Sequence, residues 1–146
     1  MLSKTCEYAV KAVVFLAQKN AHGSERENVK AIAEAIDSPD AFTGKVLQQL
    51  VKHGILTSVK GINGGFFIEP KVLAALNLLQ IVVAIEGDGI TKNCVLGLEN
   101  CSSKNPCPMH DKYHLIREDI INMLRSLLVV DLASKLEQNM IFLKNK

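Results

Sequence analysis

Three of the four cysteines lie in one short polar stretch, where this sequence concentrates groups that can do chemistry. Cys94, Cys101 and Cys107 are followed three positions later by His110. The stretch from 91 to 110 is rich in Gly, Asn, Ser and Pro, which predicts a loop rather than a helix or strand. Thiolates and an imidazole are ligands for zinc and for iron–sulfur clusters, so the pattern indicates a metal centre.

The spacing of these cysteines favours a cluster without excluding zinc. Structural zinc sites usually hold cysteines in pairs about two to four residues apart, whereas six and five residues separate Cys94, Cys101 and Cys107. Wide spacing on a flexible loop lets the chain surround a larger body, such as a 2Fe–2S or 4Fe–4S cluster. A disulfide leaves one loop thiol over and conflicts with a reducing compartment. Zinc, or a bare-thiol sensor, remains the alternative.

The composition predicts a helix-rich globular chain. It has 146 residues, 48% of them hydrophobic, with few aromatics and no Trp, so the core must consist of Leu, Ile, Val and Ala. A net charge of +2 permits nucleic-acid binding but does not indicate it. The longest apolar stretch, 72–85, is shorter than the roughly 20 residues of a membrane span, and no secretory signal is visible. We therefore expect a cytoplasmic protein without a membrane partner.

Helix signals divide the first part of the chain into three helices. The first begins near Ser3, and the second covers 29–36 with Asn28 as its N-cap. The third begins at Pro39 with Ser38 as its cap, and Gly54 ends it as a left-handed residue.

Two β-branched or aromatic runs then predict a hairpin. The runs 55–59 and 66–70 flank the turn "KGINGG", and Asn-Gly is a strong hairpin signal. Helices followed by such a hairpin predict a winged helix-turn-helix over residues 1–70. This domain binds double-stranded DNA by placing its third helix in the major groove.

The remaining residues are expected to hold the metal centre and to pair two subunits. A linking helix over 76–86 and the cysteine loop make up a second region, 71–110. The third region, 111–146, has a long helix from Asp111 and a short one from about Asp131. The long helix carries an apolar seam suited to dimerisation, made of Ile116, Ile120, Met123, Leu124 and Leu127. The fold class is mainly α.

Polar side chains along the third helix and the hairpin are the candidates for DNA contact. On the third helix and at its start they are Ser38, Thr43, Lys45, Gln48, Gln49 and Lys52, and on the hairpin they are Lys60 and Asn63. A solvated helix face is the alternative interpretation, because this segment carries little charge. A dimer doubles the phosphate contacts on which affinity depends. Gly44, inside the third helix, is explained by close approach to DNA or by simple tolerance.

Four segments together resemble the Rrf family of winged-helix transcription regulators, which includes IscR-like and NsrR-like iron–sulfur members. They are "EYAVKAVVFLA", "FTGKVLQQLVKHGILTSVKGINGGF", "IVVAIEG" and the cysteine loop. The resemblance implies a homodimer crossed by long helices and bound to a palindromic promoter site. It also implies one cluster per subunit, held by Cys94, Cys101 and Cys107.

Two residues compete for the fourth ligand position that the resemblance implies. His110 matches a histidine used by IscR-like members, and Glu7 of the partner subunit matches an acidic residue used by others. We favour His110, because its tether to Cys107 lowers the ordering entropy, with His114 as a weaker substitute. The wing departs from the family, since Lys60 stands where an arginine is common and cannot make its bidentate contact.

These observations predict a regulator that senses redox state, nitric oxide or iron through its cluster. The DNA-binding and dimer regions flank the cysteine loop in sequence, so loss of the cluster should change the spacing of two recognition helices. An iron–sulfur enzyme or electron carrier is the less favoured alternative. The sequence shows neither a nucleotide-binding glycine loop nor a nucleophile–base pair, so we expect no enzyme.

Overall fold

The computed structural model describes residues 2–23 and 26–145 and is mainly helical, as predicted. Its helices are α1 (Lys4–Ala21), α2 (Val29–Ile36), α3 (Asp40–Lys52), α4 (Pro70–Leu73), α5 (Leu78–Glu86), α6 (Gly89–Lys92), α7 (His110–Ser126) and α8 (Val129–Glu137). Its strands are β1 (Thr57–Val59) and β2 (Gly65–Phe67), which pair antiparallel. None of the described helices is long and apolar enough to cross a membrane.

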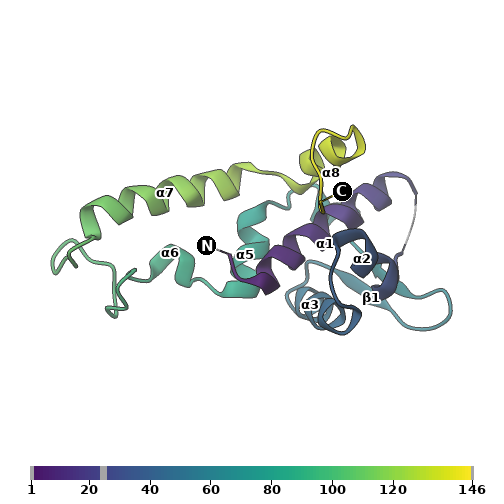
Figure 1. The fold of residues 1–146 in the computed structure, drawn as a ribbon, viewed down its shortest axis with the longest axis horizontal. Helices are drawn as coiled ribbons and strands as arrows, with labels where there is room; N and C mark the ends of the chain where they lie inside the picture. Colours follow the sequence, from purple (N-terminus) through teal and green to yellow (C-terminus); the bar gives the residue numbers. More distant parts are fainter. Residues whose placement is uncertain (1, 24–25, 146) are drawn as a thin grey trace.

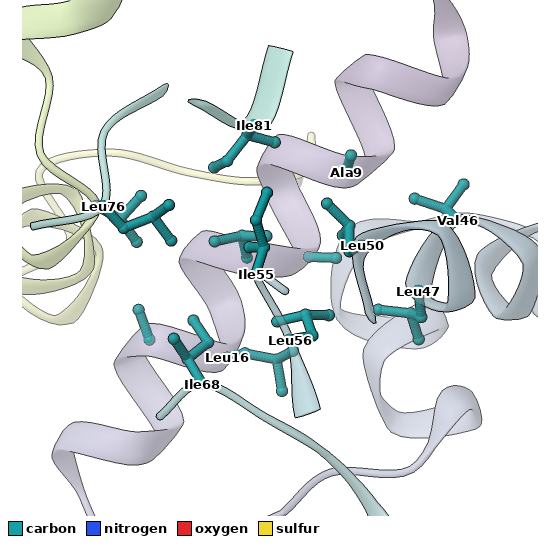
Figure 2. Packing of buried hydrophobic residues seen from close by; sticks show 14 of the residues in the cluster. Ala9, Leu16, Val46, Leu47, Leu50, Ile55, Leu56, Ile68, Leu76 and Ile81 are labelled. Carbon is teal, nitrogen blue, oxygen red and sulfur yellow. The ribbon is translucent and has the colours of Figure 1, made fainter. Parts of the chain in front are cut away.

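The core is built around α1, which α2, α3, α5 and α8 all contact. Leu16 of α1, Leu47 and Leu50 of α3 and Ile81 of α5 are fully buried there (Figure 2). Aliphatic side chains supply nearly all of this packing, as the composition predicts. Burying each such side chain contributes roughly 1.5–3 kcal/mol, so α1 fixes the other helices relative to one another.

Caps set the bounds of the first helices. Asn28 accepts a hydrogen bond from a backbone N–H group at the start of α2, as predicted, and Ser3, near which the first helix was expected to begin, caps α1 in the same way. The predicted cap of α3 is wrong by one residue: Pro39 is the N-cap, and the Ser38 hydroxyl instead contacts that of Thr43. Gly54 follows α3 with φ +72°, in the left-handed region, as predicted.

The hairpin forms a wing joined by a third segment of chain. The Phe66 backbone exchanges two hydrogen bonds with that of Glu27, at 2.8 and 3.0 Å, so the chain before α2 extends the two-stranded sheet. A Cβ at position 65 would lie 2.6 Å from the Glu27 carbonyl oxygen, and φ there is +145°. Glycine is therefore required at Gly65. The second run ends earlier than expected, because Pro70 begins α4.

Helix α7 extends away from the rest of the molecule, with the cysteine loop at its far end and α6 alongside it (Figure 1). The predicted apolar seam divides between two roles. Leu124 is buried, and Ile120 and Leu127 pack against the core of the same subunit. Ile116 and Met123 are about half exposed, at 55% and 49%. The complete seam is therefore not a free dimer surface, because its C-terminal half packs α7 against the core and beside α5.

Candidate metal and nucleic-acid sites

The loop between α6 and α7 brings the cysteines near one another in two pairs. Cys94 and Cys107 are both buried, and each of these thiols shifts the pKa of the other. Cys101 Sγ lies 3.4 Å from Nδ1 of His110, the first residue of α7. Electrostatic interaction of Cys101 with Cys107 links the two pairs. Residues far apart along the loop thus form one thiol-rich cluster.

Neighbouring groups shift the pKa values of the Cys94 and Cys107 thiols in opposite directions. The backbone N–H groups of Leu96 and Leu98 lower the pKa of the Cys94 thiol by hydrogen bonding. Burial raises the pKa of Cys107, and the neighbouring Cys94 thiol raises it further. Cys94 is therefore the thiol of this pair that loses its proton more readily.

The types of donor in the loop suit a thiolate-bound metal centre, but the donors are not yet arranged as one. Among the described residues, no group of three or more His, Cys, Asp or Glu side chains is already arranged to hold a metal ion. The two pairs supply three sulfur donors and one nitrogen donor, a set that suits zinc and iron–sulfur clusters alike.

The two candidates for the fourth ligand differ in position. His110 stands beside Cys101, and its ring stacks on that of His114 with centroids 5.8 Å apart. Glu7 lies on α1 and forms an ion pair with Lys4 at 2.8 Å. Because the hydrogen bond from Lys4 lowers the pKa of Glu7, this carboxylate is ionised at neutral pH.

Of the six side chains at and after the start of α3 that were expected to bind DNA, three are exposed. The other three are hydrogen-bonded within the subunit. Lys45, Gln48 and Lys52 are exposed. Thr43, expected on the same face, is 1% exposed and donates a hydrogen bond to the Pro39 carbonyl. The prediction that it is exposed is wrong, because its hydroxyl turns back onto Pro39 and Ser38 at the start of its own helix.

The other two side chains have partners within the subunit. Gln49 Nε2 donates to the carbonyl of Ile85 in α5 over 3.4 Å, so Gln49 joins the third helix to α5. Ser38 is half-buried, and its hydroxyl is hydrogen-bonded to that of Thr43.

The wing carries an arginine that sequence reasoning missed. Arg26 Nη1 donates to the Asn63 carbonyl over 3.2 Å, and its guanidinium lies 5.9 Å from the centre of the Phe67 ring. Lys60 and Asn63 are exposed beside it, as predicted. Only the pairing of Glu27 with Phe66 brings Arg26 to the wing, so no local pattern could reveal it.

Gly44→Ala is expected to raise the free energy of unfolding by roughly 1 kcal/mol, the usual gain from replacing a helical glycine. A Cβ there meets Val29 Cγ1 at 3.9 Å, an ordinary contact. Urea unfolding of both proteins measures the change. A variant no more stable than the wild type contradicts the assignment of Gly44 as a merely tolerated residue in α3.

Comparison with known proteins identifies relatives over nearly the whole chain. The family model for Rrf2, described as an iron-dependent transcriptional regulator, matches residues 2–135. A protein of Aquifex aeolicus described as an HTH-type transcriptional regulator is 28% identical over 145 residues, and the match covers 96% of each chain.

Solved structures with the same fold include two regulators. CymR, the global cysteine regulator of B. subtilis, matches with a TM-score of 0.70 and 23% identity, covering 92% of this chain and 96% of its own. IscR of T. potens matches with a TM-score of 0.71 and 21% identity, covering 97% of this chain and 91% of its own. The likeness confirms the winged-helix architecture predicted for this chain.

Proposed function

The chain belongs to the Rrf2 family of transcriptional regulators, and on that premise we propose that it is a cytoplasmic, homodimeric DNA-binding regulator switched by an iron–sulfur cluster. As a member of that family it is a regulator of transcription rather than an enzyme. The observation that carries the cluster proposal is the gathering of Cys94, Cys101, Cys107 and His110 at one end of α7. The family's description as iron-dependent supports iron there.

In this proposal residues 1–70 bind DNA, 71–110 hold the cluster and 111–146 pair the subunits. Lys45 and Gln48 contact base edges or phosphates in the major groove, and Lys52 contacts the backbone. Lys60, Asn63 and Arg26 contact the adjacent backbone or minor groove. The exposed side chains of Leu115, Ile116 and Met123 on the projecting helix supply the apolar surface for a second copy. Two copies place two recognition helices on a palindromic promoter site.

The cluster, when bound, supplies bonds between iron and three thiolates that oxidants, nitric oxide or iron shortage break. The chain's own residues transmit that change. The end of α5 precedes α6 and the loop, and Glu86 there accepts a hydrogen bond from the Ser3 N–H at 2.9 Å, which lowers the pKa of its carboxyl group. Burial, followed by the charge of Glu86, raises the pKa of Cys6 to about 12, so this thiol stays a hydrogen-bond donor. The Gln49 bond to Ile85 joins the same turn to α3.

Binding of DNA by cluster-loaded and cluster-free protein tests the switch. We expect the two dissociation constants to differ by about 5–150-fold, the usual range of allosteric coupling. Fluorescence anisotropy under anaerobic conditions, on a duplex selected by the protein from a random library, measures both. Equal affinities contradict the switch.

Gln49→Leu should reduce this difference in affinity, because it removes the hydrogen bond between the recognition helix and α5. In the same titration, we expect this variant to keep wild-type affinity in one cluster state. The ratio of its dissociation constants between the two cluster states should be smaller. Gln138→Leu, at the exposed residue that follows the end of α8, serves as the control. If Gln49→Leu retains the full ratio, the signal takes another route.

A bare-thiol sensor is the second candidate, and it is favoured because the buried Cys94 and Cys107 thiols each shift the pKa of the other. In that chemistry an oxidant such as a peroxide takes two electrons, the thiols lose two protons, and one S–S bond forms. Anaerobic purification separates the candidates. A brown protein containing iron and sulfide supports the cluster, whereas a colourless protein whose mass falls by about 2 Da on mild oxidation supports the disulfide.

A further inference from the structure

Arg117 is the single charged side chain that is buried in the described part of the chain. It lies in the middle of α7 and is 6% exposed. It forms no ion pair with any described carboxylate. A buried cation is costly unless hydrogen bonds or opposite charge compensate it. The partners that Arg117 has therefore indicate what it does.

Its one identified hydrogen bond spans the whole cysteine loop. Nη1 donates to the carbonyl oxygen of Asn93 over 3.0 Å, joining residues 24 positions apart. The guanidinium lies 6.0 Å from the centre of the Tyr113 ring, and Nε is buried without a partner. Arg117 thus fixes the start of the loop to the helix that follows its end.

The bond matters because the loop's donors differ in how they are tethered to α7. His110 begins α7, Cys107 lies three residues before it, and Cys101 contacts His110. Cys94 is the most distant in sequence, so bringing it to the others carries the largest loop-closure entropy. Asn93, the residue before it, is the one that Arg117 holds.

We propose that Arg117 is the positioning residue of the metal centre: it holds Cys94 against Cys107 before any metal binds. This inference rests on the proposed function only in taking the thiols as metal ligands. Because Cys94 is already held in place, less conformational entropy is lost when the loop residues bind a metal. The unpartnered Nε–H and the positive charge also favour the negative charge that three thiolates bring to the loop.

Hydrogen–deuterium exchange of the reduced, metal-free protein tests the positioning role without any cluster. In R117Q we expect the amides of residues 93–98 to exchange roughly tenfold faster, equivalent to about 1.4 kcal/mol. R125Q is the matched control, since Arg125 lies on the same helix, is exposed and bonds Asn122 locally. Loop exchange in R117Q equal to that of the wild type overturns the proposal.

Cobalt(II) titration of the same proteins gives a second readout, through the thiolate-to-metal absorption band. We expect R117Q to bind cobalt(II) roughly tenfold more weakly and R125Q to match the wild type. R117K keeps the charge without the planar fork, so it should show a smaller loss, about threefold in both measurements. If R117Q does not fold, R117K decides, and R117K behaving as wild type overturns the proposal. A wild-type protein that assembles no cluster contradicts the proposed function but leaves the exchange result for Arg117 standing.

Discussion

Cys107→Ala is expected to abolish iron and sulfide binding and to leave DNA affinity insensitive to oxidants. Cys107 interacts electrostatically with both Cys94 and Cys101 and lies three residues before His110, so it links the two ligand pairs. Iron and acid-labile sulfide per chain after anaerobic purification measure the loss, which should bring both close to zero. Removing one of three thiolates leaves too few donors to retain a cluster.

Cys6→Ala is the matched control, because Cys6 is a buried cysteine of α1 that lies outside the loop. It should retain full iron. If Cys107→Ala retains iron as well, the loop does not hold the cluster.

The double variant Lys45→Ala, Gln48→Ala is expected to lose specific DNA binding while remaining folded. Both side chains are exposed on α3, so their removal leaves the core unchanged. A good base contact contributes about 1–3 kcal/mol, and the loss occurs in both subunits of a dimer. We expect the dissociation constant for the selected duplex to rise at least a hundredfold.

Lys135→Ala, at an exposed site on α8, controls for a general loss of positive charge. Lys52→Ala should instead weaken binding to all sequences alike and reduce the salt dependence, as expected for a phosphate contact. Unchanged binding by the double variant would place the DNA surface elsewhere than on α3.

The features that follow from short-range patterns were predicted well. The start of α1 near Ser3, the cap at Asn28, the end of α3 at Gly54 and the hairpin all depend on neighbouring residues. The buried stripe of α1 also follows from helical spacing: Val13, Val14 and Ala17 are buried, and Val10 is partly buried.

The features that depend on tertiary contacts were not predictable. Thr43 is polar, so its burial follows only from the hydroxyl and carbonyl groups that Ser38 and Pro39 place beside it. Arg117 occurs in a helix rich in charges, and nothing in the local pattern distinguishes it from exposed neighbours. Arg26 reaches the wing because the neighbouring Glu27 pairs with Phe66, which lies 39 positions further along the chain. The apolar seam of α7 gave no sign that its second half packs within the subunit.

The measurement that most directly tests the account is Mössbauer spectroscopy of anaerobically purified, iron-57-labelled protein, together with iron, sulfide and zinc per chain. The account predicts iron and sulfide in equal amounts, about two or four of each per chain for the two cluster types, with a quadrupole doublet that changes in His110→Ala. A protein containing no iron, or one zinc per chain in its place, contradicts it.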